Sequence, residues 1–487
     1  IERVVFVVFV FARRRFSSSR ARRHSGTSAR ALRRRRLSRR RHRRTRRSIA
    51  LRIERARVGG YIDGYTDGSA RERRRLILGH FTIDTTALFT MPPVLDHIFE
   101  FVGRYVVSSR SKTRFFHEGW GDLALARDVS RRSRAYFAPD GNGDDECIKS
   151  ARAHRARGVD IRWSAVTMAE SGYGRNILRQ DAAFESPFAD SLPEESRLVR
   201  FARLRPDDAT TTGRETDAIA RTRRIAVLLP CTGDVDEWFR RSIARDLLAE
   251  GVECVIPTIA YYGARKPEAQ WRHVLRSVAE AKIQLSVTPV EMMLLSRALM
   301  REAEDDGFVV ELCLAGVSLG GTMSATAACA LAAARAASRD EPSTSSVVGV
   351  CCIASGADCT PYVDGSIETR LAWDVLRETL DDEDEEERPA SKARARDALL
   401  RVMEDLDIDH LLVESSVRSA VCLTARDDRF IGAKSNEKIA VALRRMTTDA
   451  SGFHREDVDG GHLQFLFGSK HVIAPSITRA FDLIRRE

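Results

Sequence analysis

The 487-residue chain has no stretch of 18 or more apolar residues, so we expect no helix that spans a bilayer. It also has no C-x-x-C pair among its nine cysteines, and their odd number argues against a complete set of disulfides. Several of these cysteines lie in apolar runs with the composition of strands. We therefore expect buried, reduced thiols rather than a zinc site or a disulfide framework.

Acidic side chains are scarce at the start of the chain. Residues 1–75 hold 26 arginines, no lysine and five acidic residues, which gives this segment a net charge of +21. Because the whole chain carries +11, the remaining 412 residues carry −10. The excess positive charge is confined to one segment, and any case for nucleic-acid binding rests on that segment alone.

Residues 1–90 form a leader rich in Arg and Ser, whose composition cannot build a hydrophobic core, so we expect it to be disordered. Such leaders are typical of transit peptides, which predicts an organellar location, in a mitochondrion or plastid, and otherwise a cytoplasmic one. An inert leader and a non-specific RNA-binding arm are the alternatives. Nucleic acid is the partner that we favour least.

The next segment, MPPVLDHIFEFVGRYVVSS (91–109), has apolar side chains near helical spacing from Leu95 to Val107. The pattern predicts an amphipathic helix that packs on the main domain, with peripheral contact to a membrane surface as the alternative. Residues 126–160 and 206–222 are polar, and we expect both stretches to be loops or insertions.

From about residue 198, apolar strands alternate with helical patterns, which predicts a mostly parallel sheet covered by helices on both faces. Strands are expected at 198–205, 224–230, 252–257, 309–315, 346–354, 417–425 and 453–459. Helices are expected at 235–249, 268–281, 290–304 and 319–337, near 434–445, and at the C-terminus. We expect the insert at 355–417 to form a lid, with its acidic run Asp381–Glu387 as a solvated loop.

The pentapeptide Gly316-Val317-Ser318-Leu319-Gly320 lies between an apolar strand and an Ala-rich helix. This is the setting of a nucleophile elbow, a sharp turn that raises a serine above the edge of the sheet. Such a turn tolerates only small residues at its flanks, here Gly316 and Gly320. The pattern alone is weak evidence, because a purely structural turn between a strand and a helix also fits it.

A nucleophilic serine needs a base, and the base needs an acid that orients it. Where such an elbow lies in a mostly parallel sheet covered by helices, the acid should follow the serine in the chain, and the histidine should come last. Asp428 in ARDDRFIG follows the next-to-last strand, and His462 in VDGGHLQ follows the last one. Because these loops meet at one end of the sheet, we predict the triad Ser318, Asp428 and His462, with Asp427 as the alternative acid.

Acyl transfer also needs hydrogen-bond donors for a developing oxyanion. One predicted donor is the backbone N–H of Leu319, directly after the serine. The other is the N–H of Thr232 in the loop PCTGDVDEWFRR, with Gly233 as its neighbour. We expect the side chain of Asp234 to cap the following helix and Cys231 to fill space. The chemistry calls for no metal and no organic cofactor.

Several motifs together are more specific than this general pattern. They are TGD followed by Trp (232–238), YYGARKP (261–267), GVSLGG (316–321) and DGGH (459–462), with FFHEGWGD (115–122) and FESPFADSLPEESRLVRF (184–201) upstream. This set resembles the alpha/beta hydrolase domain-containing protein 18 family. The chain departs from the family pattern at Gly432, where a proline commonly ends the acid loop, and residues 1–90 have no counterpart.

The resemblance implies the α/β-hydrolase fold for residues 91–487 and a serine hydrolase of esterase or lipase type. It places the family's Ser, Asp and His at Ser318, Asp428 and His462, and its oxyanion loop at Thr232 and Gly233. It also implies lipid acyl esters as substrates and an organelle membrane as the setting. The alternative is a non-catalytic member that uses the fold for binding or as a scaffold, and we predict no particular oligomeric state.

Overall fold

The computed structural model describes residues 75–78, 81–84, 96–97, 99–100, 111–137, 146–172, 175–207, 222–336, 347–378, 391–412, 417–468 and 470–485. The chain divides into two units, Ile1–Thr85 and Thr86–Glu487. In the first unit, β1 (Arg75–Leu78) and β2 (Phe81–Asp84) pair as an antiparallel hairpin. The rest of the predicted leader, most of the predicted helix at 91–107 and the acidic run at 381–387 lie outside the described residues.

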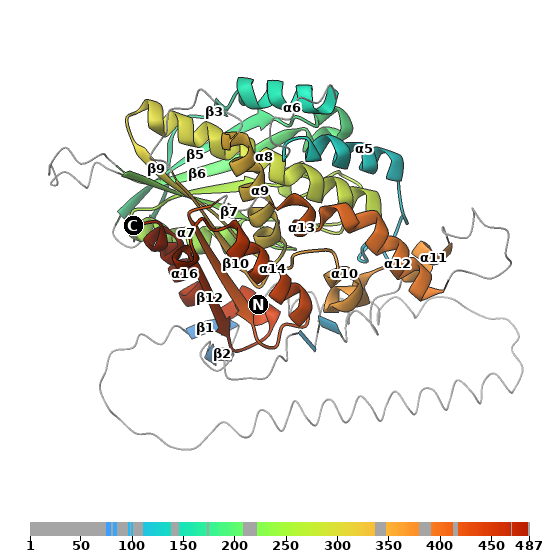
Figure 1. Cartoon of the computed structure of the whole chain (residues 1–487). Helices are drawn as coiled ribbons and strands as arrows, with labels where there is room; N and C mark the ends of the chain where they lie inside the picture. The colour runs from blue at the N-terminus through green and yellow to red at the C-terminus, as the bar shows by residue number, and fades with distance from the viewer. Residues whose placement is uncertain are drawn as a thin grey trace, which may run out of the picture. The chain divides into compact units, whose positions relative to one another are not determined.

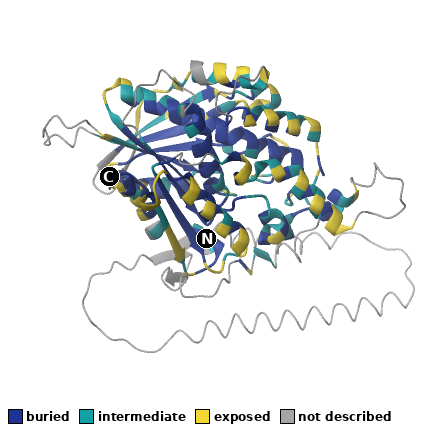
Figure 2. Cartoon of the chain, viewed as in Figure 1, coloured by how far each residue is buried: buried dark blue, intermediate teal, exposed yellow. Residues whose placement is uncertain are grey.

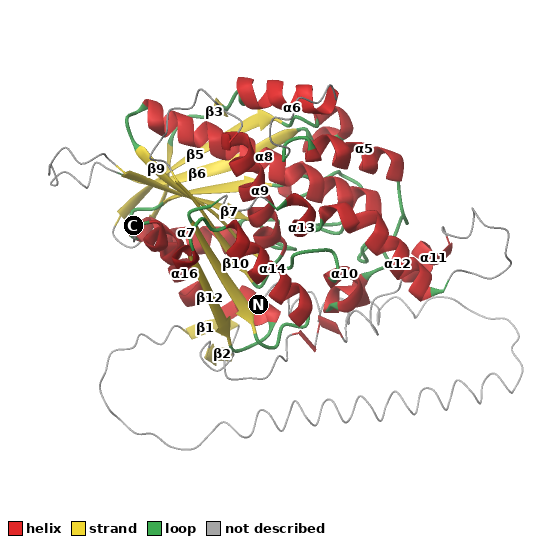
Figure 3. Ribbon diagram, in the orientation of Figure 1, coloured by secondary structure: helices red, strands yellow, loops and turns green. Residues whose placement is uncertain are grey.

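A ten-stranded sheet organises the described part of the second unit (Figures 1 and 3), in the order β12-β11-β10-β9-β7-β8-β6-β5-β3, with β4 paired to β5. The strands from β12 to β8 run parallel, and β6, β5, β3 and β4 add antiparallel pairs at one edge. The parallel strands are β7 (Thr222–Leu229), β8 (Glu253–Thr258), β9 (Val309–Val317), β10 (Val347–Ile353), β11 (Ser419–Ala425) and β12 (Phe453–Val458). The others are β3 (Arg162–Trp163), β4 (Thr167–Gly172), β5 (Arg175–Glu185) and β6 (Leu198–Pro206). The predicted mostly parallel sheet is confirmed.

Alternate side chains of the central strands pack into two separate cores. Along β7, Ile225, Val227 and Leu229 belong to one hydrophobic cluster, whereas Ala226 and Leu228 belong to the other. Successive side chains of a strand point to opposite faces, so a continuous apolar run is expected where both faces are buried. Figure 2 shows these central strands as the buried interior of the unit.

Helices cover both faces of the sheet (Figure 1). α7 (Trp238–Ala249) and α16 (Lys470–Ile484) pack on one face, and α8 (Val278–Asp305), α9 (Leu319–Ala336) and α14 (Ala433–Met446) on the other. The remaining helices are α5 (Leu123–Arg134), α6 (Glu146–Arg157), α10 (Pro361–Asp364), α11 (Trp373–Glu378), α12 (Lys392–Met403), α13 (Ile408–Leu411) and α15 (His462–Gly468). Within the described ranges, none of the helices combines the length and the apolar character that a membrane crossing needs.

The loop predicted at 126–160 is wrong, and three strands had no prediction. The stretch 126–160 is not a loop, because it contains most of α5 and all of α6. The buried face of α5 consists of small residues, Ala126, Val129, Ser130 and Ser133, and therefore lacks the large apolar side chains that mark a helix in a sequence. The antiparallel strands β3, β4 and β5 were not predicted either, since they carry many polar side chains.

The helices predicted at 268–281 and 290–304 are not two separate helices. Residues 268–277 are turns and loop, and one helix, α8, begins at Val278 and continues through Pro289 to Asp305. A proline inside a helix removes one backbone hydrogen bond and usually ends or bends it. Here Pro289 and both of its neighbours are buried, so tertiary packing holds the helix together across the missing bond.

Candidate active site

Ser318 lies in the turn between β9 and α9 and has a φ of 57°, in the left-handed region that L-residues seldom adopt. Its side chain is nearly buried. A Cβ on Gly316 would lie 2.3 Å from the carbonyl carbon of Gly320, and a Cβ on Gly320 would lie 2.7 Å from the carbonyl oxygen of Leu229. The two glycines therefore allow the turn to close on itself and to press against the end of β7.

His462 is the first residue of α15 and follows two glycines. Its Nε2 lies 2.9 Å from the Oγ of Ser318, and its Nδ1 lies 2.9 Å from Oδ2 of Asp428. The side chains of His462 and Asp428 are 2% and 1% exposed. The structure thus brings the three residues that the sequence singled out into one buried chain of hydrogen bonds.

A turn after β11 fixes the orientation of Asp428. Its Oδ1 accepts the backbone N–H groups of Phe430 at 2.8 Å and Ile431 at 2.9 Å, which directs Oδ2 toward His462. Asp427, the alternative acid, is exposed, and its backbone N–H donates to the carbonyl of Gly460. The structure therefore places Asp428, and not Asp427, against the imidazole.

The surroundings of His462 favour its protonated form. Burial lowers the pKa of its imidazole, but the carboxylates of Asp428 and Asp96 outweigh burial and raise the pKa above the ordinary value of 6.5. The ring of Phe430 stacks on the imidazole, with 4.7 Å between ring centroids and 18° between planes. The imidazole is thus held between Asp428 and Ser318, and the ring of Phe430 covers one of its faces. Phe430 has no sequence signature, because its role depends on contacts across the fold.

The two predicted oxyanion donors lie beside Ser318. Thr232 and Leu319 line the same pocket as the serine. Thr232 lies in a turn, and Leu319 is the first residue of α9. In the described part of the chain, the backbone N–H of Thr232 has no partner, and that of Leu319 has none outside α9. The would-be Cβ of Gly320 meets the carbonyl oxygens of Leu229 and Pro230 at 2.7 and 2.9 Å, so the turn lies directly against the strand that leads to Thr232.

Asp234 does not cap α7, contrary to the prediction from the sequence. The residue that precedes α7 is Glu237, which has a φ of 62° and makes no side-chain cap. Instead, Oδ2 of Asp234 accepts a hydrogen bond of 2.6 Å from Nε of Arg240, and both side chains are buried. Arg240 also donates to the carbonyls of Leu228 and Pro257. This pair ties the loop of Thr232 to the ends of β7 and β8.

The motif around Tyr262 supports the same loop. Burial raises the pKa of the Tyr262 hydroxyl, whereas its interactions with the backbone of Gly233 and the side chain of Thr232 act in the opposite direction. Farther along, Arg265 makes two hydrogen bonds of 2.8 Å to Glu291, and both side chains are fully buried. The motif therefore contacts the loop of Thr232 through Tyr262 and is tied to α8 through Arg265. These contacts depend on the fold and have no sequence signature.

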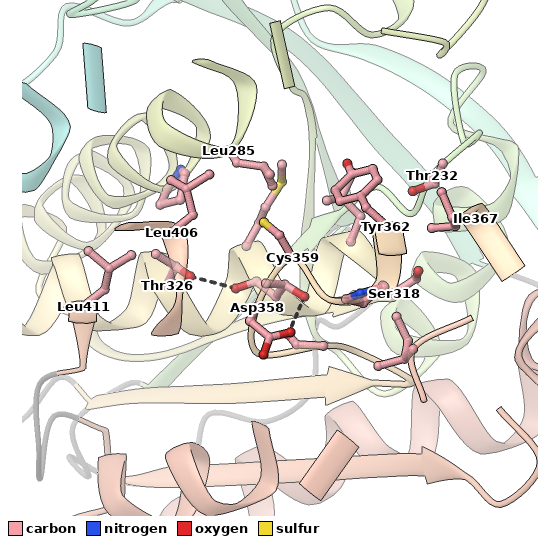
Figure 4. Close-up of a pocket in the computed structure, with 17 residues that line it drawn as sticks. Thr232, Leu285, Ser318, Thr326, Asp358, Cys359, Tyr362, Ile367, Leu406 and Leu411 are labelled. Carbon is pink, nitrogen blue, oxygen red and sulfur yellow. Dashed lines mark hydrogen bonds between the residues drawn. The ribbon is translucent and has the colours of Figure 1, made fainter. Parts of the chain in front are cut away.

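A pocket opens beside Ser318 and encloses about 680 Å³, the open space at its mouth included. Figure 4 shows Ser318 and Thr232 at one end, and Leu406 and Leu411 at the other. About half of the wall comes from the insert at 355–417, whose described parts fold into short helices. The wall is mainly apolar and consists of Thr232, Leu285, Pro289, Ser318, Leu319, Thr322, Met323, Thr326, Gly356, Asp358, Cys359, Pro361, Tyr362, Ile367, Leu406, Leu411 and Ile431.

The cysteine near the site, Cys231, is buried and is not set up as a nucleophile. Burial, with a further contribution from Asp234, raises the pKa of the Cys231 thiol well above its ordinary value, so the nucleophilic thiolate is disfavoured. Seven of the nine cysteines are buried. The described ranges contain no group of three or more His, Cys, Asp or Glu side chains arranged to hold a metal ion.

Comparison with known proteins identifies one matching family. The model of the family described as "Alpha/beta hydrolase domain containing 18" matches residues 113–398 and 382–483. These ranges include Ser318, Asp428 and His462, whereas Asp96 precedes them.

Among solved structures, the chain is similar to a cold-adapted esterase from an Arctic intertidal metagenomic library, with 12% identity over 65% of this chain and 99% of the other, and a TM-score of 0.35. It is also similar to an acetyl xylan esterase from Paenibacillus sp. R4, with 12% identity over 68% and 93% of the two chains, and a TM-score of 0.39. A third is a mutant of the rice cell wall degrading esterase LipA from Xanthomonas oryzae, with 10% identity over 67% and 99%, and a TM-score of 0.39.

Proposed function

Because the chain belongs to the alpha/beta hydrolase domain containing 18 family, we propose that it is a serine hydrolase that cleaves carboxylic esters with apolar acyl groups. The observation that carries the proposal is the pair of 2.9 Å hydrogen bonds that link Ser318, His462 and Asp428. A serine is a weak nucleophile until a neighbouring base accepts its proton, and this arrangement supplies the base and the acid that orients it.

In the proposed reaction, Nε2 of His462 takes the hydroxyl proton of Ser318 as Oγ attacks the ester carbonyl. Asp428 holds the imidazole through Nδ1 and stabilises its positive charge. The N–H groups of Leu319 and Thr232 stabilise the oxyanion of the tetrahedral intermediate. The imidazolium then gives its proton to the departing alcohol, and a water molecule activated by His462 releases the acid from the acyl-enzyme.

The pocket supports an apolar acyl group as the part of the substrate bound next to the serine. Leu285, Leu406 and Leu411 lie along its wall away from Ser318, and burial of each methylene of an acyl chain contributes about 0.8 kcal/mol. A lipid acyl ester is the substrate class that combines a carboxylic ester with such a chain. We therefore include lipid acyl esters in the proposal.

The test is hydrolysis of a series of p-nitrophenyl esters, from acetate to dodecanoate, by the full chain and by Ser318→Ala. We expect the wild type to prefer the longer esters and Ser318→Ala to lose roughly 10⁶-fold in kcat. Equal turnover by the two proteins would contradict the proposal. Binding of the esters without turnover by the wild type would instead support the non-catalytic alternative.

A further inference from the structure

A carboxylate from a distant part of the sequence lies against the backbone of His462. Asp96 is fully buried, and 366 residues separate it from the histidine. Its Oδ2 accepts the backbone N–H of His462 at 3.0 Å, and its Oδ1 accepts the N–H of Leu463 at 3.0 Å. Asp96 does not line the pocket, so its contacts are with the base rather than with the space for a substrate.

Two neighbours of Asp96 contact the loop that carries the acid. The ring of Phe99 packs on Phe430, with 4.8 Å between centroids, and Phe430 in turn stacks on the imidazole of His462. Glu100 accepts a hydrogen bond of 2.9 Å from Nε of Arg429. Asp96, Phe99 and Glu100 therefore touch both the loop of Asp428 and the loop of His462.

Burying a carboxylate at this point is costly unless it is compensated. The pKa of Asp96 is raised above its ordinary value by burial and by the charge of Asp428, whereas the N–H groups of Leu463 and His462 and the charge of His462 act in the opposite direction. A neutral cap would have satisfied a backbone N–H without this cost. The compensation comes from two backbone donors and from the imidazole, which points to a role for the negative charge as well as for the hydrogen bonds.

We propose that Asp96 is a positioning residue that fixes the backbone of His462 and stabilises the imidazolium formed during catalysis. The proposal rests on the function proposed above. The two N–H bonds fix the start of α15, so that the ring stays between Ser318 and Asp428. The ionisable groups that act on His462 are Asp428 and Asp96, and those that act on Asp96 are His462 and Asp428. A second carboxylate thus acts on the base from outside the triad.

The first test is Asp96→Asn in the full chain, which keeps the size of the side chain and one oxygen but removes the charge. We expect kcat to fall roughly 10-fold with little change in KM, as is typical when a charge-assisted hydrogen bond is weakened. The acid limb of the kcat/KM profile should move to lower pH, because loss of the charge lowers the pKa of His462. Asp96→Glu, which keeps the charge, should leave that limb where the wild type has it.

The matched control is Asp122→Asn. Asp122 caps α5 by accepting the N–H of Leu125 at 2.9 Å, so its replacement removes a carboxylate that caps a helix elsewhere in the domain. We expect this variant to keep the kcat and the pH profile of the wild type. The thermal midpoint of unfolding is measured for each variant. An Asp96 variant whose midpoint matches that of the control has lost the charge and not the fold.

A second measurement does not depend on ester hydrolysis. In Ser318→Ala, the titration of the His462 imidazole followed by NMR should lie at higher pH than in the Ser318→Ala, Asp96→Asn double variant. This difference would support the role of Asp96 even if no ester were hydrolysed. Equal titration in the two proteins would overturn the proposal, and so would an Asp96→Glu variant whose acid limb shifts as far as that of Asp96→Asn.

Discussion

The proposed nucleophile, Ser318, and its proposed base, His462, are built in different ways. The turn of Ser318 is local, because Gly316 to Gly320 supply both its tight geometry and its contact with the end of β7. The proposed base is assembled from three segments, since Asp428 lies 34 residues before His462 and Asp96 lies 366 residues before it. A local turn depends on its own few residues, whereas the base depends on the packing of separate parts of the chain.

The loop of Thr232 resembles His462 in that residues distant in the sequence hold it in place. It is held by the buried pair of Asp234 and Arg240 and by Tyr262, which lies 30 residues farther along the chain. Thus, among the proposed catalytic groups, only Ser318 is positioned by its neighbours in the sequence. The proposed acid, base and second oxyanion donor are positioned by groups that are distant from them in the sequence.

The largest effect on the base should come from Asp428→Asn, compared with Asp427→Asn. The amide cannot stabilise the imidazolium and favours the wrong tautomer of His462, so we expect kcat to fall roughly 10⁴-fold. Asp427 is exposed and does not contact the imidazole, so its variant should stay close to the wild type. Steady-state kinetics on one ester checks both, and similar losses in the two variants would contradict the assignment of the acid.

A smaller effect is expected from Thr232→Pro, which removes one oxyanion donor because proline has no N–H. We expect kcat to fall about 10²–10³-fold. Thr232→Ala keeps the N–H and loses only the contact with Tyr262, so its loss should be much smaller. If the two variants lose the same activity at comparable thermal midpoints, the donor is not the N–H of Thr232.

The smallest effect should come from Leu406→Trp, which adds bulk at the end of the pocket away from Ser318 (Figure 4). We expect kcat/KM for a dodecanoate ester to fall roughly 10-fold, and the value for the acetate ester to fall less, because a short acyl group does not reach this end. An equal loss for both esters would place the acyl chain elsewhere.

The sequence predicted well those features that depend on local pattern. The apolar strands from 198 to 459 and the turn at Ser318 combine composition with spacing, and the chain order of acid and histidine follows from the topology of the sheet. The sequence predicted helix boundaries poorly where tertiary packing overrides the local preference of a residue. Pro289 should end a helix and does not, because its surroundings are buried.

Support for the site was the hardest part to predict. Asp96 lies in a segment whose pattern indicates only an amphipathic helix, and nothing near it in the sequence marks a partner 366 residues away. Asp234 is a residue type that often caps a helix, yet its carboxylate pairs with Arg240, six residues farther on. Such contacts become visible only when the loops at the ends of the strands are placed in space.

The most direct test of the central claim is covalent labelling with a fluorophosphonate, followed by mass spectrometry of the labelled peptide. We expect one adduct, on Oγ of Ser318, which forms much more slowly in Asp428→Asn and does not form in Ser318→Ala. Undiminished labelling of Ser318→Ala, or a folded wild type that does not react, would contradict the claim that His462 and Asp428 activate this serine.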